Sequence, residues 1–198
     1  MSSGVWVFGY GSLVSPASFG HTLGRVLTRG VDVHPATVTG FGRRWNYGVM
    51  TAIGESEEAD GTRRAWTVVA LGITTSEHET VNGVVAWVAH GELDALDRRE
   101  RNYDRVDVSD RITIVGQVDR GPVVTYVPRA EPVEWYEAAR DRGTAAVERR
   151  YWDLVDAAFT ELGPDEHRRY HATTPPPDVP IVTMRRDSVP LRHRVGSD

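Results

Sequence analysis

The chain contains neither cysteine nor lysine among its 198 residues. The absence of cysteine excludes disulfides, thiolate catalysis and cysteine-bound metals. The absence of lysine excludes a Walker phosphate loop, because that motif requires a lysine after its glycines. All 23 basic residues are therefore arginines.

Dense basic runs and long hydrophobic runs are also missing. The formal net charge is −5, which argues against a nucleic-acid partner held by phosphate contacts. The first residues carry no basic segment, and the apolar run after them is too short for a signal peptide or a membrane span. We expect a cytoplasmic protein, a monomer or homodimer, that acts on a small molecule and has neither a membrane nor a nucleic-acid partner.

The sequence is organised around the segment 5–14, VWVFGYGSLV, in which an apolar run meets two glycines. We interpret it as a strand followed by a loop, because glycine permits a sharp turn and lets a ligand approach the main chain. A dinucleotide-binding fingerprint would need a glycine in place of Val14. A nucleophile elbow would need glycines in place of Tyr10 and Val14. The loop is therefore predicted to bind a ligand without either of these chemistries.

A second informative segment, 91–103, is predicted to be helical. At about 100° per residue, Leu93 and Leu96 form an apolar stripe, and Glu100 falls within it. A carboxylate turned toward apolar groups has a raised pKa, which suits a general acid or base. The alternative is that Glu100 pairs with an arginine or caps the strand that follows. Asp97 is the rival carboxylate, placed at the wet edge of the stripe.

The arginines of this segment are predicted to point away from the stripe. They are Arg98, Arg99 and Arg101. On this reading Glu100 is the single charged group turned inward.

Most of the chain up to residue 128 reads as short strands, with a polar, acidic loop at 54–64 and an acidic turn at 76–79. Gly83, inside a strand, is predicted to mark a close backbone approach beneath the Tyr10 loop. We expect 103–109 and 111–118 to pair with each other. After the first strand, which leads into the glycine loop, the predicted strands are 31–41, 40–47, 65–73, 81–90, 103–109, 111–118 and 122–128. The predicted fold class is α+β, a small, mixed but mostly antiparallel and partly closed β-barrel with flanking helices.

Residues 129–198 are predicted to form a helical and proline-rich extension packed on a single domain spanning 1–198. A stripe from Val147 to Leu162 repeats at helical spacing and is read as core packing, ending at Gly163. His167 and His171 lie four residues apart, as zinc ligands do on helices, but the sequence places no third ligand nearby. We therefore expect neither a metal nor a cofactor.

Several segments together resemble the γ-glutamylcyclotransferase family. They are Tyr10-Gly11-Ser12-Leu13, then Gly83-Val84-Val85, then Leu96-Asp97-Arg98-Arg99-Glu100 with Tyr103, and a strand carrying Tyr126. The resemblance covers residues 5–128. It implies that Glu100 is the catalytic acid/base and that Tyr10, Gly11, Ser12 and Leu13 hold a γ-glutamyl group, with Tyr103 and Tyr126 lining the pocket.

The implied reaction is an intramolecular aminolysis in which the substrate's α-amine attacks its own γ-carbonyl. The products are 5-oxoproline and a free amine or amino acid, formed without a metal. Glutathione and γ-glutamyl amino acids are the preferred substrates, and γ-glutamylamines or a γ-glutamyl-protected natural product stay open. The acidic 54–64 segment and the extension depart from the family pattern. The alternative function is a non-catalytic module that binds a γ-glutamyl-like ligand or a protein on the same fold.

Overall fold

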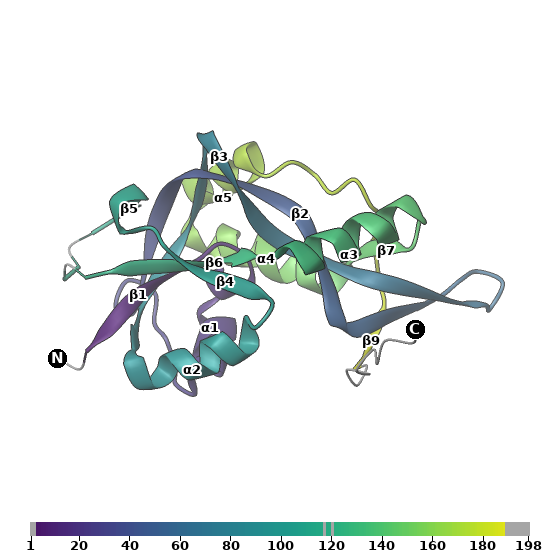
Figure 1. Cartoon of the computed structure of the whole chain (residues 1–198), viewed down its shortest axis with the longest axis horizontal. Helices are drawn as coiled ribbons and strands as arrows, with labels where there is room; N and C mark the ends of the chain where they lie inside the picture. The colour runs from purple at the N-terminus through teal and green to yellow at the C-terminus, as the bar shows by residue number, and fades with distance from the viewer. Residues whose placement is uncertain (1–2, 117, 120, 189–198) are drawn as a thin grey trace, which may run out of the picture.

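The computed structural model describes residues 3–116, 118–119 and 121–188 (Figure 1). The first half contains β1 (Gly4–Gly9), η1 (Ser12–Val14), α1 (Pro16–Leu23), β2 (Val33–Glu57), β3 (Arg63–Ala89) and α2 (His90–Arg99). The middle contains β4 (Tyr103–Asp107), η2 (Ser109–Arg111), β5 (Ile112–Ile114), β6 (Val123–Pro128) and α3 (Ala130–Asp141). The last part contains β7 (Ala145–Glu148), α4 (Arg149–Leu162), α5 (Pro164–Thr173), β8 (Ile181–Val182) and β9 (Arg185–Ser188).

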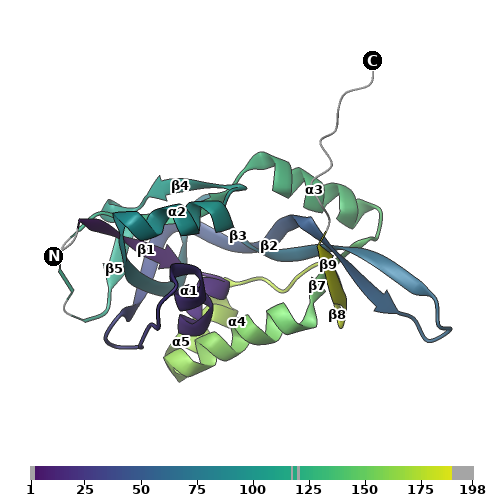
Figure 2. The ribbon, with the colours of Figure 1, turned by 90° about the horizontal axis from the view of Figure 1, so that it is seen from below.

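One nine-stranded sheet organises the molecule, and its main path runs β4-β6-β1-β3-β2-β5. Most neighbours are antiparallel, whereas β1–β6, β3–β7 and β7–β8 are parallel. Helices α4 and α5 lie on one side of this sheet and α3 lies on the other (Figure 2). The predicted α+β class, with a largely antiparallel sheet and flanking helices, is confirmed. In the described part of the chain the sheet path has two ends, β4 and β5, so the sheet does not close on itself through these strands.

Strands β2 and β3 form one long hairpin, which corrects several predicted boundaries. Residues 33–47 of the predicted strands 31–41 and 40–47 lie in β2, and 65–73 and 81–89 lie in β3, whereas His90 begins α2. The predicted acidic turn at 76–79 is therefore strand, and Glu79 in it accepts a hydrogen bond from Arg44 Nη2 at 2.6 Å. The predicted loop at 54–64 is reduced to a tight turn between Glu57 and Arg63. These two residues pair with each other, and the residues on either side of them continue the pairing toward the sheet. Charged residues misled the prediction, since one face of an antiparallel strand can be solvated.

The hairpin bends at irregularities in its pairing. Register shifts lie between Thr39 and Phe41, between Arg44 and Tyr47, and between Gly48 and Ile53. Such bulges add a residue to one strand and increase its bend and twist. One end of the hairpin therefore belongs to the main sheet around β1, while its tip extends away from the rest of the molecule (Figure 1).

The predicted pairing of 103–109 with 111–118 is wrong. Strand β4 pairs with β6, and β5 pairs with β2 on the opposite edge of the sheet. The turn η2 that separates them carries the chain from one edge to the other. Residue 117 of the predicted second strand lies outside the described residues.

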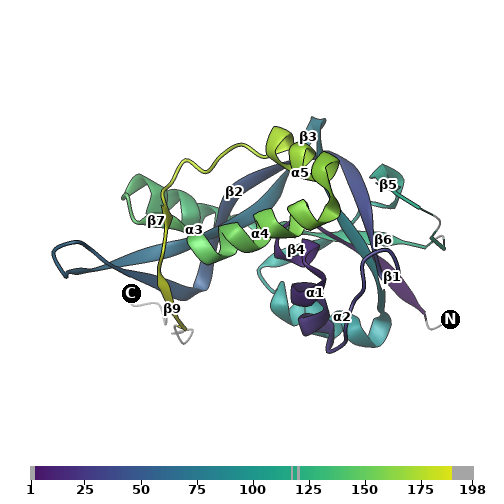
Figure 3. The same ribbon diagram turned by 180° about the vertical axis from the view of Figure 1, so that it is seen from behind.

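The region after residue 128 contributes strands as well as helices. Val147, predicted to be helical, lies in β7, which joins the sheet parallel to β3. The helical stripe belongs to α4, and Gly163 separates it from α5, which starts at Pro164. Both helices lie in front of the sheet in Figure 3, which shows the face turned away from the viewer in Figure 1. Phe159 of α4 and Tyr170 of α5 belong to the same hydrophobic cluster as the strand β1 residues.

A buried arginine connects this region to the sheet. Arg43 of β2 is fully buried, and its guanidinium lies 4.9 Å from the Phe159 ring centre and 5.0 Å from that of Tyr170. It donates hydrogen bonds to Thr174 Oγ1 at 2.8 Å and to the Asn82 carbonyl. Burial lowers the pKa of Arg43 to about 10, so it stays charged at neutral pH.

No helix in residues 3–116, 118–119 and 121–188 is long and apolar enough to cross a membrane.

Candidate active site

All seven site residues predicted from the sequence line one pocket. These residues are Tyr10, Gly11, Ser12, Leu13, Glu100, Tyr103 and Tyr126. The pocket has an empty volume of about 340 Å³, including the open space at its mouth. The residues come from the β1–η1 loop, the end of α2, the start of β4 and strand β6, so the fold joins segments that are more than 100 residues apart in the chain.

The β1–η1 loop forms one wall of this pocket. Strand β1 ends at Gly9, and η1 begins at Ser12. Because glycine has only main-chain atoms, Gly9 and Gly11 line the pocket with backbone alone. The predicted close approach of Gly83 is confirmed, since a β-carbon on Gly83 would lie 2.2 Å from the Gly9 carbonyl oxygen. The neighbouring strand therefore supports the loop directly from beneath.

Glu100 lies at the end of α2 rather than inside it. The helix ends at Arg99, and Glu100 is the C-cap residue, whose N–H donates to the Leu96 carbonyl at 2.7 Å. The prediction that Glu100 continues the helical stripe is wrong in this detail, but its side chain is still turned inward and only 13 % exposed. Burial raises the pKa of Glu100, although the neighbouring Arg99 guanidinium lowers it in part.

Arg99 is the main departure from the predicted site. The sequence pattern places it away from the inward stripe, yet its Nε lies 3.0 Å from Glu100 Oε1. Its Nη2 donates to Ser12 Oγ at 2.8 Å, and its Nη1 donates to the Ser18 carbonyl at 3.1 Å. The long side chain of Arg99 allows this, because it can reach from the surface of the last turn past the helix end to Glu100 and Ser12. Arg99 thus links the candidate acid/base to the glycine loop.

The tyrosines of the pocket hold one another and are not free to move. Tyr10 Oη donates to the Tyr126 carbonyl at 2.8 Å, and Tyr126 Oη donates to Asp97 Oδ1 at 2.8 Å. Tyr103 stacks on Tyr47 with ring centres 4.5 Å apart. Burial raises the pKa of Tyr10 and of Tyr103 well above the usual tyrosine value, so both hydroxyls stay protonated at neutral pH. These side chains therefore form fixed walls.

Asp97, the rival carboxylate, lies at the wet edge as predicted. Its side chain is 44 % exposed, and it forms an ion pair with Arg105 at 2.8 Å.

Tyr151 completes the pocket and was not predicted to be near it. It lies in the first turn of α4, in the segment interpreted as core packing, and it lines the pocket together with Leu71 of β3. A β-carbon on Gly11 would lie 3.0 Å from Tyr151 Oη. No local signal in the sequence marks Tyr151, because only the docking of α4 on the sheet brings it to the loop.

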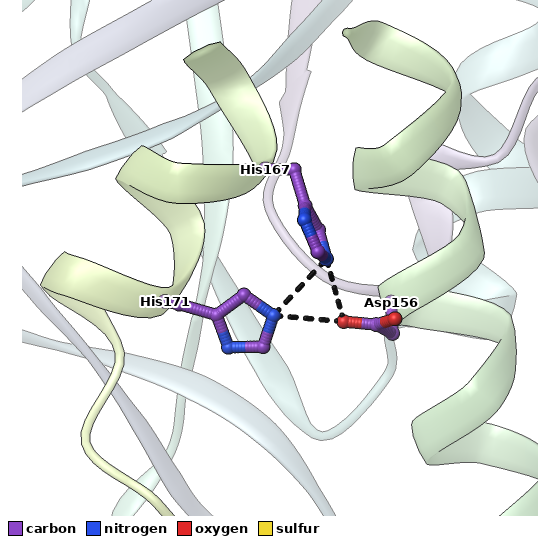
Figure 4. Close-up of side chains that lie close together, drawn as sticks. All are labelled: Asp156, His167 and His171. Carbon is purple, nitrogen blue, oxygen red and sulfur yellow. Dashed lines mark hydrogen bonds and ion pairs between the residues drawn. The ribbon is translucent and has the colours of Figure 1, made fainter. Parts of the chain in front are cut away.

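The two histidines at helical spacing have a partner that the sequence did not suggest. Asp156 of α4 faces His167 and His171 of α5, and one ligand atom from each lies within 4.8 Å of the others (Figure 4). The expectation that no third ligand lies nearby is therefore wrong. The cluster is separate from the pocket around Glu100, since none of its three residues lines that pocket.

Comparisons with known proteins identify the fold. No family model matches the chain, and no curated protein matches it in sequence. Among solved structures, a γ-glutamyl cyclotransferase is similar over 88% of this chain and 90% of its own, with a TM-score of 0.54 and 16% identity. A γ-glutamyl cyclotransferase specific to glutathione from yeast is similar over 86% of this chain and 95% of its own, with a TM-score of 0.53 and 14% identity.

An uncharacterized protein from Homo sapiens is similar over 91% of this chain and 93% of its own, with a TM-score of 0.54 and 17% identity. At these identities the likeness establishes a shared fold. The structural neighbours of this chain thus include γ-glutamyl cyclotransferases, and the α+β architecture matches theirs.

Proposed function

We propose that this protein is a γ-glutamyl cyclotransferase that converts a γ-glutamyl amide into 5-oxoproline and a free amine or amino acid. The observation that carries the proposal is the position of Glu100, whose nearly buried carboxylate lines the same small pocket as the backbone of Gly9 and Gly11. The pocket opens to solvent at its mouth, so a γ-glutamyl group held inside would have its leaving group toward that opening.

The reaction needs a group that moves protons from one nitrogen to another. The substrate's α-ammonium must lose one proton before its nitrogen attacks the γ-carbonyl, and that nitrogen loses a second proton as the five-membered lactam forms. Glu100 accepts the first proton and delivers it to the nitrogen of the leaving amine as the amide bond breaks. The ionised Glu100 then takes the second proton from the lactam nitrogen and passes it to the free amine, which leaves as an ammonium. Its raised pKa favours this exchange near neutral pH, because an ordinary carboxylate is too weak a base for the task.

The remaining pocket residues position the substrate. Main-chain N–H groups of the glycine loop would stabilise the negative charge on the carbonyl oxygen as the amine attacks. Fixed tyrosine walls would hold the glutamyl chain folded, with its amine close to its own carbonyl. Ser12 already accepts a hydrogen bond from Arg99, which leaves its hydroxyl hydrogen available to donate to a ligand acceptor.

A second candidate function, a non-catalytic module that binds a γ-glutamyl-like ligand, is favoured by one contact. The Arg99–Glu100 ion pair engages one oxygen of the carboxylate and stabilises its ionised form. If that pair persists when a ligand binds, the pocket would recognise an amine without exchanging its proton. The composition favours a small molecule in the cytoplasm as the ligand in both cases, with the protein a monomer or homodimer.

The experiment that tests the proposal is a leaving-group panel. Purified protein is incubated with γ-glutamyl-alanine, glutathione and a γ-glutamylamine, and 5-oxoproline is measured. Glu100→Gln is expected to lower kcat by about 10²–10⁴-fold with little change in substrate affinity, because it removes the proton carrier but keeps the side chain's shape. Asp94→Asn is the matched control, since it neutralises an exposed carboxylate on the same helix.

Two outcomes decide between the candidates. Release of 5-oxoproline that depends on Glu100 and not on Asp94 supports the enzyme. Ligand binding without 5-oxoproline in the unmutated protein contradicts the enzyme and supports the binding module.

A further inference from the structure

We propose that Asp156, His167 and His171 form a binding site for a divalent transition-metal ion, with Zn²⁺ as the best-fitting ion. The site joins α4 to α5 and is independent of the pocket around Glu100. His167 and His171 are four residues apart in α5, so their rings project from one face of that helix toward Asp156 on α4 (Figure 4).

The three ligand atoms form a nearly equilateral triangle. Asp156 Oδ1 lies 2.9 Å from Nε2 of His167 and 2.9 Å from Nε2 of His171, and the two Nε2 atoms are 3.1 Å apart. Zinc binds imidazole nitrogen and carboxylate oxygen at about 2.0–2.2 Å in tetrahedral geometry, which separates neighbouring ligand atoms by about 3.3 Å. The observed triangle is slightly tighter than one face of such a tetrahedron, and small side-chain rotations would open it.

Hydrogen bonds satisfy only part of this arrangement. Each Nε2 lies within hydrogen-bond distance of both the carboxylate oxygen and the other Nε2, and a neutral imidazole carries only one N–H. If both Nε2 atoms carry hydrogen, both N–H groups can donate to Asp156 Oδ1, but the two ring nitrogens then lie 3.1 Å apart with no hydrogen bond between them. If one Nε2 is bare, it loses its hydrogen bond to the carboxylate. A cation at the centre accepts a lone pair from all three atoms at once.

The donor set indicates which ions fit. Two imidazoles and one carboxylate favour Zn²⁺ and other late first-row transition metals. Mg²⁺ and Ca²⁺ are disfavoured, because they take oxygen ligands. The side chains are 35 %, 31 % and 48 % exposed for Asp156, His167 and His171, so an ion can enter and water can fill its fourth position. The bound ion would hold α4 against α5. It would add to the packing between these helices, in which the rings of Phe159 and Tyr170 stack with centres 4.3 Å apart.

The test uses the untagged full-length protein after treatment with a chelator. Zn²⁺ is titrated by calorimetry, and Co²⁺ is titrated in parallel because its visible absorption reports tetrahedral coordination. We expect one ion per chain and a higher melting temperature with Zn²⁺ than with chelator. His171→Ala and Asp156→Asn should each lower the affinity for Zn²⁺ by at least ~10–100-fold. Loss of a residue that only supports a ligand already costs that much, and these two residues are ligands themselves.

His21→Ala is the matched control, because His21 is an exposed histidine on α1 that lies outside the cluster. It should leave both affinity and the zinc-dependent melting shift unchanged. Each variant is first checked by circular dichroism in chelator, and the exposed His171 serves if Asp156→Asn does not fold. The proposal is overturned if the unmutated protein shows no binding at 100-µM-scale zinc, or if His171→Ala binds as tightly as the His21→Ala control.

Discussion

Arg99 offers the sharpest test of how the candidate active site sets its proton affinity. Its guanidinium lowers the pKa of Glu100, against the larger effect of burial. Replacing it by methionine in Arg99→Met keeps an unbranched apolar stem and removes the charge. The pKa of Glu100 should therefore rise further. Because Glu100 must be ionised to accept a proton, the acidic limb of the pH–rate profile should move to higher pH.

The size of the accompanying stability change follows from the contacts of Arg99. The variant loses an ion pair to Glu100 at 3.0 Å and hydrogen bonds to Ser12 at 2.8 Å and to the Ser18 carbonyl at 3.1 Å. The side chain is 29 % exposed, so screening by water reduces each contribution. We expect the free energy of unfolding to fall by about 1–2 kcal/mol. For a domain of this size that is a drop in melting temperature of about 2–8 °C.

The assay is 5-oxoproline release across a pH series, with Arg98→Met as the control. Arg98 is the exposed neighbour on the same helix, so the control changes the protein's net charge equally. Below the limb both proteins should lose about tenfold in rate per pH unit, as one essential proton requires. The electrostatic reasoning is refuted if the acidic limb of the Arg99→Met profile stays in place or moves to lower pH. If the limb of Arg98→Met shifts equally, the shift is due to net charge and not to the contact with Glu100.

Two further predictions concern the supports of the site. Gly83→Ala should destabilise the protein by about 2–4 kcal/mol, because its methyl group would lie 2.2 Å from the Gly9 carbonyl oxygen. The control is Gly91→Ala in α2, where a methyl group meets open space. It should be neutral or stabilising by up to ~1 kcal/mol. Equilibrium denaturation measures both, and equal effects would contradict the close approach. Arg43→Lys should cost about 2–4 kcal/mol, because an ammonium cannot keep the guanidinium's hydrogen bonds to Asn82 while also contacting the stacked rings of Phe159 and Tyr170. A denaturation midpoint equal to that of the unmutated protein would contradict this role.

Several parts of the molecule could be predicted from local sequence. The apolar run before Gly9 and the two glycines after it define a strand and its loop, since no other residue gives the backbone that freedom. Leu93 and Leu96 fix the inward face of α2, and this face brings Glu100 close to the core. Gly83 marks a contact with β1 because a side chain there has no space. These signals depend on the residue type and its nearest neighbours alone.

Strand boundaries in the hairpin were less predictable. Charged residues at 54–64 and 76–79 look like turns when each is read with its neighbours alone. The flanks of 54–64 pair up to Glu57 and Arg63, and 76–79 lies in a bulge of β3 between residues that pair with Thr39 and Phe41. The pairing on either side carries these charged residues within or next to the strands, with their charges in water. Long-range pairing therefore outweighs local preference.

The sequence by itself determined the glycine loop, the inward carboxylate and the class of the fold. Only the tertiary structure decided that Arg99 lies against Glu100, that Tyr151 completes the pocket, and that Asp156 meets two histidines. Each of these contacts joins residues through the docking of α4 or the end of α2. The pattern of residues along the chain does not predict these contacts, because they depend on how surfaces of segments far apart in sequence pack together.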